Sequence, residues 1–134
     1  MRPDRSPPPD GVEKDPSTQC RARIGGAKEA LAAAYLAAQG LRLIARNHRC
    51  RFGEIDLVMR DGDSLVFVEV RYRGSSRFGS PAETVDRHKQ RRLIAAAGHY
   101  LHANPSVLPC RFDVVAISGQ DRIEWLQNAF NADD

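Results

Sequence analysis

Two strand-like runs on either side of a short turn constrain this chain more than any other feature. Residues 53–60 and 64–72 are rich in β-branched and apolar residues, and Asp61-Gly62-Asp63 between them is a strong β-hairpin signal. A two-residue turn at this point places Asp56 directly opposite Glu69. Opposed side chains in a strand pair have Cβ atoms about 4.5–5.5 Å apart. Two carboxylates are therefore predicted to lie side by side within a largely apolar sheet.

This pair of acids needs a compensating positive charge. Opposed like charges destabilise a strand pair, and burial raises the cost further. A divalent cation with oxygen ligands is one solution, and such an ion can polarise a phosphodiester and activate an attacking water. The alternative is a set of ion pairs in which Arg71 serves both Glu54 and Glu69. The sequence leaves both interpretations open.

Glu29 is a third candidate acid. Apart from Lys28, it is the only charged residue in an otherwise apolar segment with helical periodicity, residues 27–38. Glu29 could join the acids of the hairpin. With Gly26 as N-cap, however, it also occupies a position that helix capping and the helix dipole favour.

The remaining periodicities indicate an α/β fold with a mixed sheet flanked by helices. We expect the order α-β-β-β-α-β-β, with residues 64–72 as a central strand because both of its faces are apolar. The predicted elements are a helix from about residue 26 that stops at Gly40, strands over 41–47, 53–60 and 64–72, a helix over 85–103, and strands over 111–118 and 122–126. Residues 1–24 are rich in proline and predicted to be a disordered tail, which leaves one folded domain over residues 25–134.

Composition excludes several classes of protein. The chain has 134 residues, of which 42% are hydrophobic and 28% charged, as expected for one ordinary domain. No apolar run approaches the about 20 residues of a membrane helix, so no membrane partner is expected. The N-terminus lacks the apolar core of a secretory signal. The three cysteines are odd in number and widely spaced, which favours reduced thiols and a cytoplasmic location.

Basic residues cluster although the formal net charge is only +3. Residues 41–53 hold four arginines and no acid, and residues 71–92 hold seven basic residues against two acids. This pattern favours a polyanion such as nucleic acid, and a solvated helix face is the alternative. The candidate phosphate-binding residues are Arg73, Arg77, Lys89 and Arg92. The four histidines do not show the spacing of a zinc site.

Several segments together resemble the YraN family of bacterial proteins, over about residue 25 to the C-terminus. The segments are Gly25…Lys28-Glu29-Ala30…Tyr35-Leu36…Gly40…Ala45-Arg46-Asn47, Gly53-Glu54-Ile55-Asp56-Leu57, Val66-Phe67-Val68-Glu69-Val70-Arg71, Phe78-Gly79-Ser80-Pro81 and Arg111-Phe112-Asp113-Val114-Val115. The family is similar to PD-(D/E)xK nucleases of the Holliday-junction resolvase type. The resemblance implies a restriction-endonuclease-like core and a nuclease-like domain over residues 25–134.

The resemblance also implies a catalytic site. Glu29, Asp56 and Glu69 match the metal-binding acids, with Mg²⁺ or Mn²⁺ as the cofactor, and Arg71 stands where the motif has lysine. Arginine keeps the positive charge but is effectively never deprotonated. Lys28 is a second departure, since the family commonly has glycine there.

These observations lead to one expected function and two alternatives. We expect a metal-dependent endonuclease acting on DNA, with branched or single-stranded DNA as candidate substrates. By analogy with resolvases, a homodimer is expected. A nucleic-acid-binding module that keeps the fold but has lost the chemistry is the first alternative, because of Arg71. A protein-interaction scaffold is the second.

Overall fold

The computed structural model describes residues 16–72, 85–119 and 122–132. The element order is α-β-β-β-α-β-β, as the sequence predicted. The elements are α1 (Pro16–Ala38), β1 (Arg42–Cys50), β2 (Gly53–Asp61), β3 (Ser64–Tyr72), α2 (Arg87–Ala103), β4 (Cys110–Ser118) and β5 (Arg122–Phe130). None of the helices in these ranges is long and apolar enough to cross a membrane.

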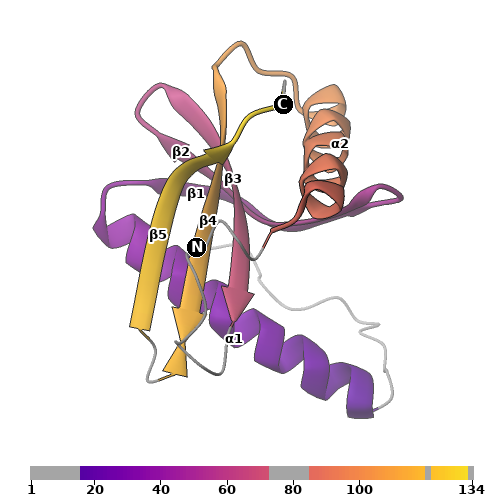
Figure 1. The fold of residues 1–134 in the computed structure, drawn as a ribbon, viewed down its shortest axis with the longest axis vertical. Coiled ribbons are helices and arrows are strands. Elements are labelled where there is room, and N and C mark those ends of the chain that lie inside the picture. The colour runs from indigo at the N-terminus through magenta and orange to yellow at the C-terminus, as the bar shows by residue number, and fades with distance from the viewer. Residues whose placement is uncertain (1–15, 73–84, 120–121, 133–134) are drawn as a thin grey trace, which may run out of the picture.

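The five strands form one mixed sheet in the order β1-β2-β3-β4-β5. Strands β3 and β4 are parallel, and the other neighbours are antiparallel. Helix α2 makes the crossover between the parallel strands, and α1 and α2 cover opposite faces of the sheet (Figure 1). The prediction of a central β3 is confirmed: Val66 and Val68 pack in the core cluster of α1, whereas Leu65 and Phe67 pack in that of α2.

The hairpin register is also confirmed. Asp61 pairs with Ser64 and Leu57 pairs with Val68, so the turn contains two residues. Gly62 in this turn has φ +60°, a conformation that glycine adopts without steric cost. A one-residue slip would move every side chain of the strand to the other face, so this turn decides on which face the acids of β2 and β3 lie.

The first helix starts earlier than its sequence indicated. It was predicted to begin near Gly26 after a tail over residues 1–24, but α1 begins at Pro16. Proline suits the first position of a helix because its fixed φ matches and its missing N–H is not needed there. Residues 1–15 lie outside the described part of the chain.

The C-terminus of α1 is closed by a Schellman motif. The Leu41 N–H donates to the Leu36 carbonyl at 3.1 Å, and the Gly40 N–H donates to the Ala37 carbonyl at 3.0 Å. Gly40 has φ +106°, which a side chain disfavours. Leu36 and Leu41 are both buried in the same core cluster, so the motif fixes the path of the chain into β1.

Two strands are longer than predicted. Strand β5 was expected to end near Leu126 but continues to Phe130, and β1 continues to Cys50 instead of Asn47. The extension of β5 is explained by Phe130, which is buried and stacks on Phe112 with ring centroids 5.0 Å apart.

Helix α2 begins at Arg87 rather than Val85, because the Asp86 carboxylate caps it by accepting the Lys89 N–H at 2.8 Å.

One buried acid in the sheet is fully satisfied. The Asp113 carboxylate accepts two hydrogen bonds from Arg111, at 2.9 and 3.0 Å, and one from the Trp125 indole at 2.9 Å. The Asn128 N–H donates a fourth, at 2.9 Å. Asp113 is only 1% exposed, and buried charges persist when paired in this way. Asp113 therefore ties β5 to β4 and has a structural role.

Gly26 in α1 and Gly40 just beyond its end should respond oppositely to replacement by alanine. Gly40→Ala should lower the free energy of unfolding by about 1 kcal/mol, because a side chain at positive φ is strained. Gly26 lies inside α1, and an added Cβ would meet no atom within 4 Å. Gly26→Ala should therefore raise the free energy of unfolding by about 0.5–1 kcal/mol. Urea unfolding of the two variants and the parent protein measures both changes. Equal signs for the two substitutions would contradict this account of α1.

Candidate functional site

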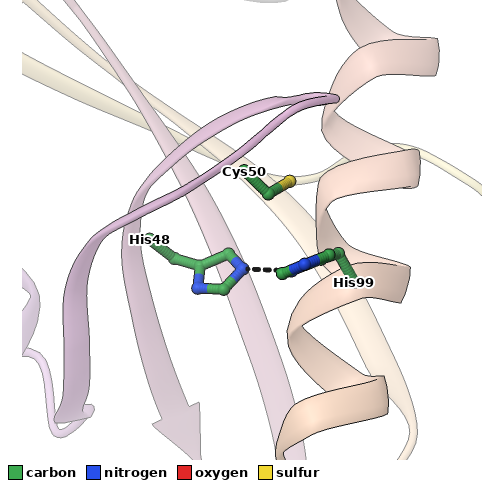
Figure 2. Close-up of side chains that lie close together, drawn as sticks. All are labelled: His48, Cys50 and His99. Atoms are coloured by element: carbon green, nitrogen blue, oxygen red, sulfur yellow. Dashed lines mark hydrogen bonds between the residues drawn. The ribbon is translucent and has the colours of Figure 1, made fainter.

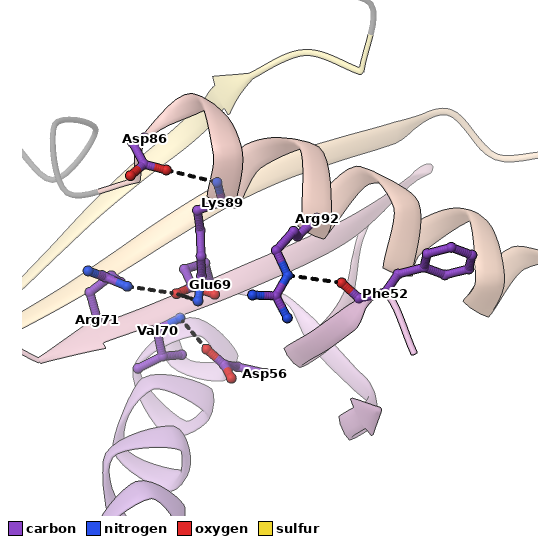
Figure 3. A network of polar contacts seen from close by, with 8 residues as sticks. All are labelled: Phe52, Asp56, Glu69, Val70, Arg71, Asp86, Lys89 and Arg92. Carbon is purple, nitrogen blue, oxygen red and sulfur yellow. Dashed lines mark hydrogen bonds and ion pairs between the residues drawn. The ribbon is translucent and has the colours of Figure 1, made fainter. Parts of the chain in front are cut away.

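The carboxylates gather where the ladder between β2 and β3 ends. The last pair of this ladder joins Leu57 to Val68. One residue further, the Asp56 Oδ2 accepts the backbone N–H of Val70 at 2.8 Å (Figure 3). The side chain of Asp56 thus takes the place of a ladder hydrogen bond.

Asp56 is strongly perturbed by this environment. Burial is the main cause that raises its pKa, from 3.8 to about 8, and the neighbouring charge of Glu69 is the second. Glu29 and Glu54 raise it further, whereas the hydrogen bond from Val70 lowers it. The hairpin register predicted that Asp56 and Glu69 lie close together. Their closeness is reflected in the pKa of Asp56, which the negative charge of Glu69 raises.

Glu29 reaches this cluster from α1. Burial raises its pKa, and a hydrogen bond with Asn47 partly offsets that effect. Its Oε1 is buried and has no hydrogen-bond partner among the described residues. A buried carboxylate oxygen without a partner is costly, so this atom indicates a site that a proton or a cation would complete.

Three acids place oxygens together. Glu29, Glu54 and Asp56 each offer one carboxylate oxygen, and these oxygens all lie within 4.8 Å of one another. Oxygen ligands from carboxylates suit hard cations such as Mg²⁺. The donor set and the unpartnered Glu29 oxygen both fit a divalent cation of this type. The sequence had assigned Glu54 only to an ion pair, although its alternation with Asp56 placed both on one face.

Glu69 lies next to positive charges instead. It is 4% exposed, and its Oε2 is 3.4 Å from Arg71 Nη1 and 3.5 Å from Lys89 Nζ (Figure 3). The ion-pair alternative therefore describes Arg71 with Glu69. It does not describe Glu54, which pairs with Arg49 at 3.4 Å. Glu69 combines two roles: it repels Asp56 and orients two cations.

A cleft of about 180 Å³ is lined by Glu54, Asp56 and Glu69, whereas Glu29 is not among its lining residues. Its lining residues come from β2, β3 and α2: Gly53, Glu54, Asp56, Glu69, Lys89, Arg92 and Leu93. The acids Glu54, Asp56 and Glu69 line the cleft from the sheet, and the cations Lys89 and Arg92 line it from α2. Arg92 also ties its helix to the β1–β2 turn, because its Nε donates to the Phe52 carbonyl at 3.1 Å (Figure 3).

The candidate phosphate-binding residues divide into two groups. Lys89 and Arg92 line the cleft beside the acids. Arg73 and Arg77 lie outside the described residues, and their roles remain predictions. The contact of Lys89 with Glu69 was not foreseen, because it joins a helix to a strand across a long stretch of sequence.

Comparison with known proteins identifies the family. The model of the uncharacterised protein family UPF0102 matches residues 28–117, well over half of the chain. The chain belongs to this family, the YraN family. A UPF0102 protein of Nitrosomonas europaea is 53% identical over 109 residues, which cover 80% of this chain and 92% of the relative. UPF0102 proteins of Chromohalobacter salexigens and Xanthomonas oryzae pv. oryzae are also 53% identical, over 82% and 85% of this chain and 92% and 96% of the relatives.

The raised pKa of Asp56 predicts how stability changes with pH. Without divalent cations, the folded protein keeps a proton on Asp56 between pH 3.8 and about 8 that the unfolded chain loses. The contribution of Asp56 to the free energy of unfolding should therefore fall as pH rises through this window. Asp56→Asn removes this contribution, so the variant should gain stability over the parent protein as pH rises from 5 to 8.

Urea unfolding in buffer with a chelator, at several pH values, measures this difference. Glu124→Gln is the matched control, because Glu124 is exposed on β5, and it should show no such trend. A stability difference between Asp56→Asn and the parent protein that is the same at pH 5 and pH 8 would contradict the prediction.

Proposed function

We propose that this member of the family is a metal-dependent endonuclease-like protein that hydrolyses phosphodiester bonds in DNA. The observation that carries the proposal is one cleft that Glu54 and Asp56 line together with Lys89 and Arg92. The carboxylate of Glu29, which has a buried oxygen without a partner among the described residues, places an oxygen within 4.8 Å of oxygens of these two acids. Oxygen ligands on one wall and cations on the other suit a phosphate group with a divalent ion. Branched or single-stranded DNA is the proposed substrate class, in line with the resemblance to resolvase-type nucleases.

Asp56 and Glu29 would hold Mg²⁺ or Mn²⁺, and Glu54 is the third oxygen ligand that the geometry adds. Glu69, also predicted as a ligand, lies close enough to Asp56 to raise its pKa. When bound, the ion would supply a lowered pKa for an attacking water and neutralise charge on the phosphate. The chain itself orients the oxygens: the Val70 N–H fixes Asp56.

Arg71 and Lys89, the two cations that contact Glu69, differ in the chemistry that they can perform. Arg71 stands at the position of the lysine in the nuclease motif, and its guanidinium can stabilise negative charge but cannot take part in proton transfer. Lys89 reaches the same carboxylate oxygen from α2, with a side chain 40% exposed. We assign to Lys89 the task of orienting the attacking water. Arg71 then contributes charge, an effect worth about 3–4 kcal/mol for a well-placed donor.

Binding of DNA would follow from Lys89 and Arg92 together with the basic segments around the cleft. Each phosphate that a cation neutralises releases counterions, so affinity should fall steeply with salt. The uneven charge distribution supports this step, since the net charge of +3 alone would not.

The role of the acids is tested with a panel of branched, duplex and single-stranded DNAs in Mg²⁺ or Mn²⁺. The parent protein should cleave at least one of them. Asp56→Asn should lower the cleavage rate at least about 100-fold, because loss of an ion ligand exceeds the 10–100-fold effect of losing a group behind it. Glu124→Gln should cleave at the parent rate. Equal rates for Asp56→Asn and the parent protein would refute the assigned site.

The role of Lys89 is tested separately. Lys89→Ala should lower the cleavage rate at saturating DNA about 100-fold, the scale of effect expected when a reacting group is misplaced, and should also weaken DNA binding by the loss of one phosphate contact. Lys89→Arg should restore the affinity but not the rate, because a planar guanidinium does not position a water as a compact ammonium does. Arg91→Ala, an exposed neighbour on α2, is the control. Full rescue of the rate by Lys89→Arg would show that charge alone is needed.

The pairing of Arg71 with Glu69 favours a second candidate function. If Arg71 supplies only positive charge to the cleft and no group there transfers a proton, the chain would be a DNA-binding module without catalysis. Salt-sensitive binding, no cleavage of any DNA in the panel, and binding that tolerates Asp56→Asn would support this candidate. A gain of cleavage in Arg71→Lys would instead favour a weakened enzyme.

A further inference from the structure

A second cluster of metal-binding side chains lies apart from the carboxylates. His48 and Cys50 come from β1, and His99 comes from α2 (Figure 2). His48 and Cys50 are two residues apart on a strand, so their side chains leave the same face. One imidazole nitrogen from each histidine and the thiol sulfur all lie within 4.8 Å of one another. Residue spacing did not indicate this cluster, because His48 and His99 are 51 residues apart.

The two imidazoles already face each other. His48 Nε2 and His99 Nδ1 are 3.1 Å apart (Figure 2). Two nitrogens bound to one tetrahedral zinc ion at 2.0–2.1 Å are about 3.3 Å apart. The distance between the two nitrogens therefore already suits a shared ion, and rotation of the rings would turn both lone pairs toward it.

Aromatic neighbours fix the orientation of both rings. The His48 ring lies edge-to-face on Tyr100, with centroids 5.2 Å apart at 88°. The His99 ring contacts Phe52, with centroids 6.4 Å apart. Rings held in this way lose little further freedom on binding an ion, and such preorganisation favours affinity.

The ligand chemistry selects the ion. Two imidazoles and a thiolate suit borderline-soft ions such as Zn²⁺, whereas Mg²⁺ prefers oxygen. Burial, with the nearby His99 as the second cause, lowers the pKa of His48. His99 is exposed and Cys50 carries a free thiol, so an ion can reach the cluster from solvent.

We propose that His48, Cys50 and His99 form a Zn²⁺ site that links β1 to α2. The three side chains would supply three of four tetrahedral ligands, with water as the fourth. The Cys50 thiol would give its proton to solvent on binding. This site is independent of the carboxylate cleft, and its existence does not depend on the proposed nuclease function.

The test is a titration of metal-free, reduced, full-length protein with Zn²⁺ in a calorimeter at neutral pH. One ion should bind per chain. Cys50→Ser and His99→Ala should each weaken binding more than about 100-fold, beyond the cost of losing a group that only supports a ligand. With Co²⁺ as the probe, the parent protein should show a thiolate-to-metal charge-transfer band that Cys50→Ser abolishes.

Matched controls separate this site from others. Cys110→Ser removes an exposed thiol, and His102→Ala removes another histidine of α2; both should bind Zn²⁺ like the parent protein. Because His99 is exposed, His99→Ala carries the test even if Cys50→Ser does not fold. No binding by the parent protein, or binding that is unchanged in His99→Ala, would overturn the proposal. So would binding that Asp56→Asn removes, since the ion would then sit among the carboxylates.

Discussion

The repulsion among carboxylates at the open end of the β2–β3 ladder is the constraint on which the rest of the site depends. The two-residue turn at Gly62 sets the register, and the register brings Asp56 next to Glu69. Ending the ladder at Leu57 frees the Val70 N–H to stabilise Asp56. Even so, the pKa of Asp56 remains raised, and Glu29 Oε1 has no hydrogen-bond partner among the described residues. Such an imbalance costs folding free energy, and a ligand that supplies charge would offset it.

Asp113 shows how the same sheet treats an acid with a structural role. Its two oxygens accept four hydrogen bonds from Arg111, Trp125 and Asn128. Glu29, by contrast, leaves one buried oxygen without a partner in the described part of the chain. Asp113 is almost fully buried, whereas Glu29 is half-buried beside other polar and charged groups. The hydrogen bonding of their oxygens supports a functional role for Glu29 rather than for Asp113.

The sequence predicted what local chemistry determines. Turn residues indicated the hairpin register, and an apolar run on both faces indicated the central position of β3. The start of α1 was wrong by about ten residues, because Gly25-Gly26 resembled a boundary although the helix continues through them. The contact of Lys89 with Glu69 joins α2 to β3, and that of His48 with His99 joins β1 to α2. Residue spacing carries no information on such contacts.

The attachment of the β1–β2 turn to α2 has a mechanical consequence. Arg92 holds the Phe52 carbonyl, and His99 meets His48 further along the same helix. Glu54 follows two residues after Phe52, whereas Asp56 is anchored to the central strand through Val70. A small shift of α2 would therefore move Glu54 while Asp56 stays in place. The position of the helix would thus set the distance between the carboxylate oxygens of Glu54 and Asp56.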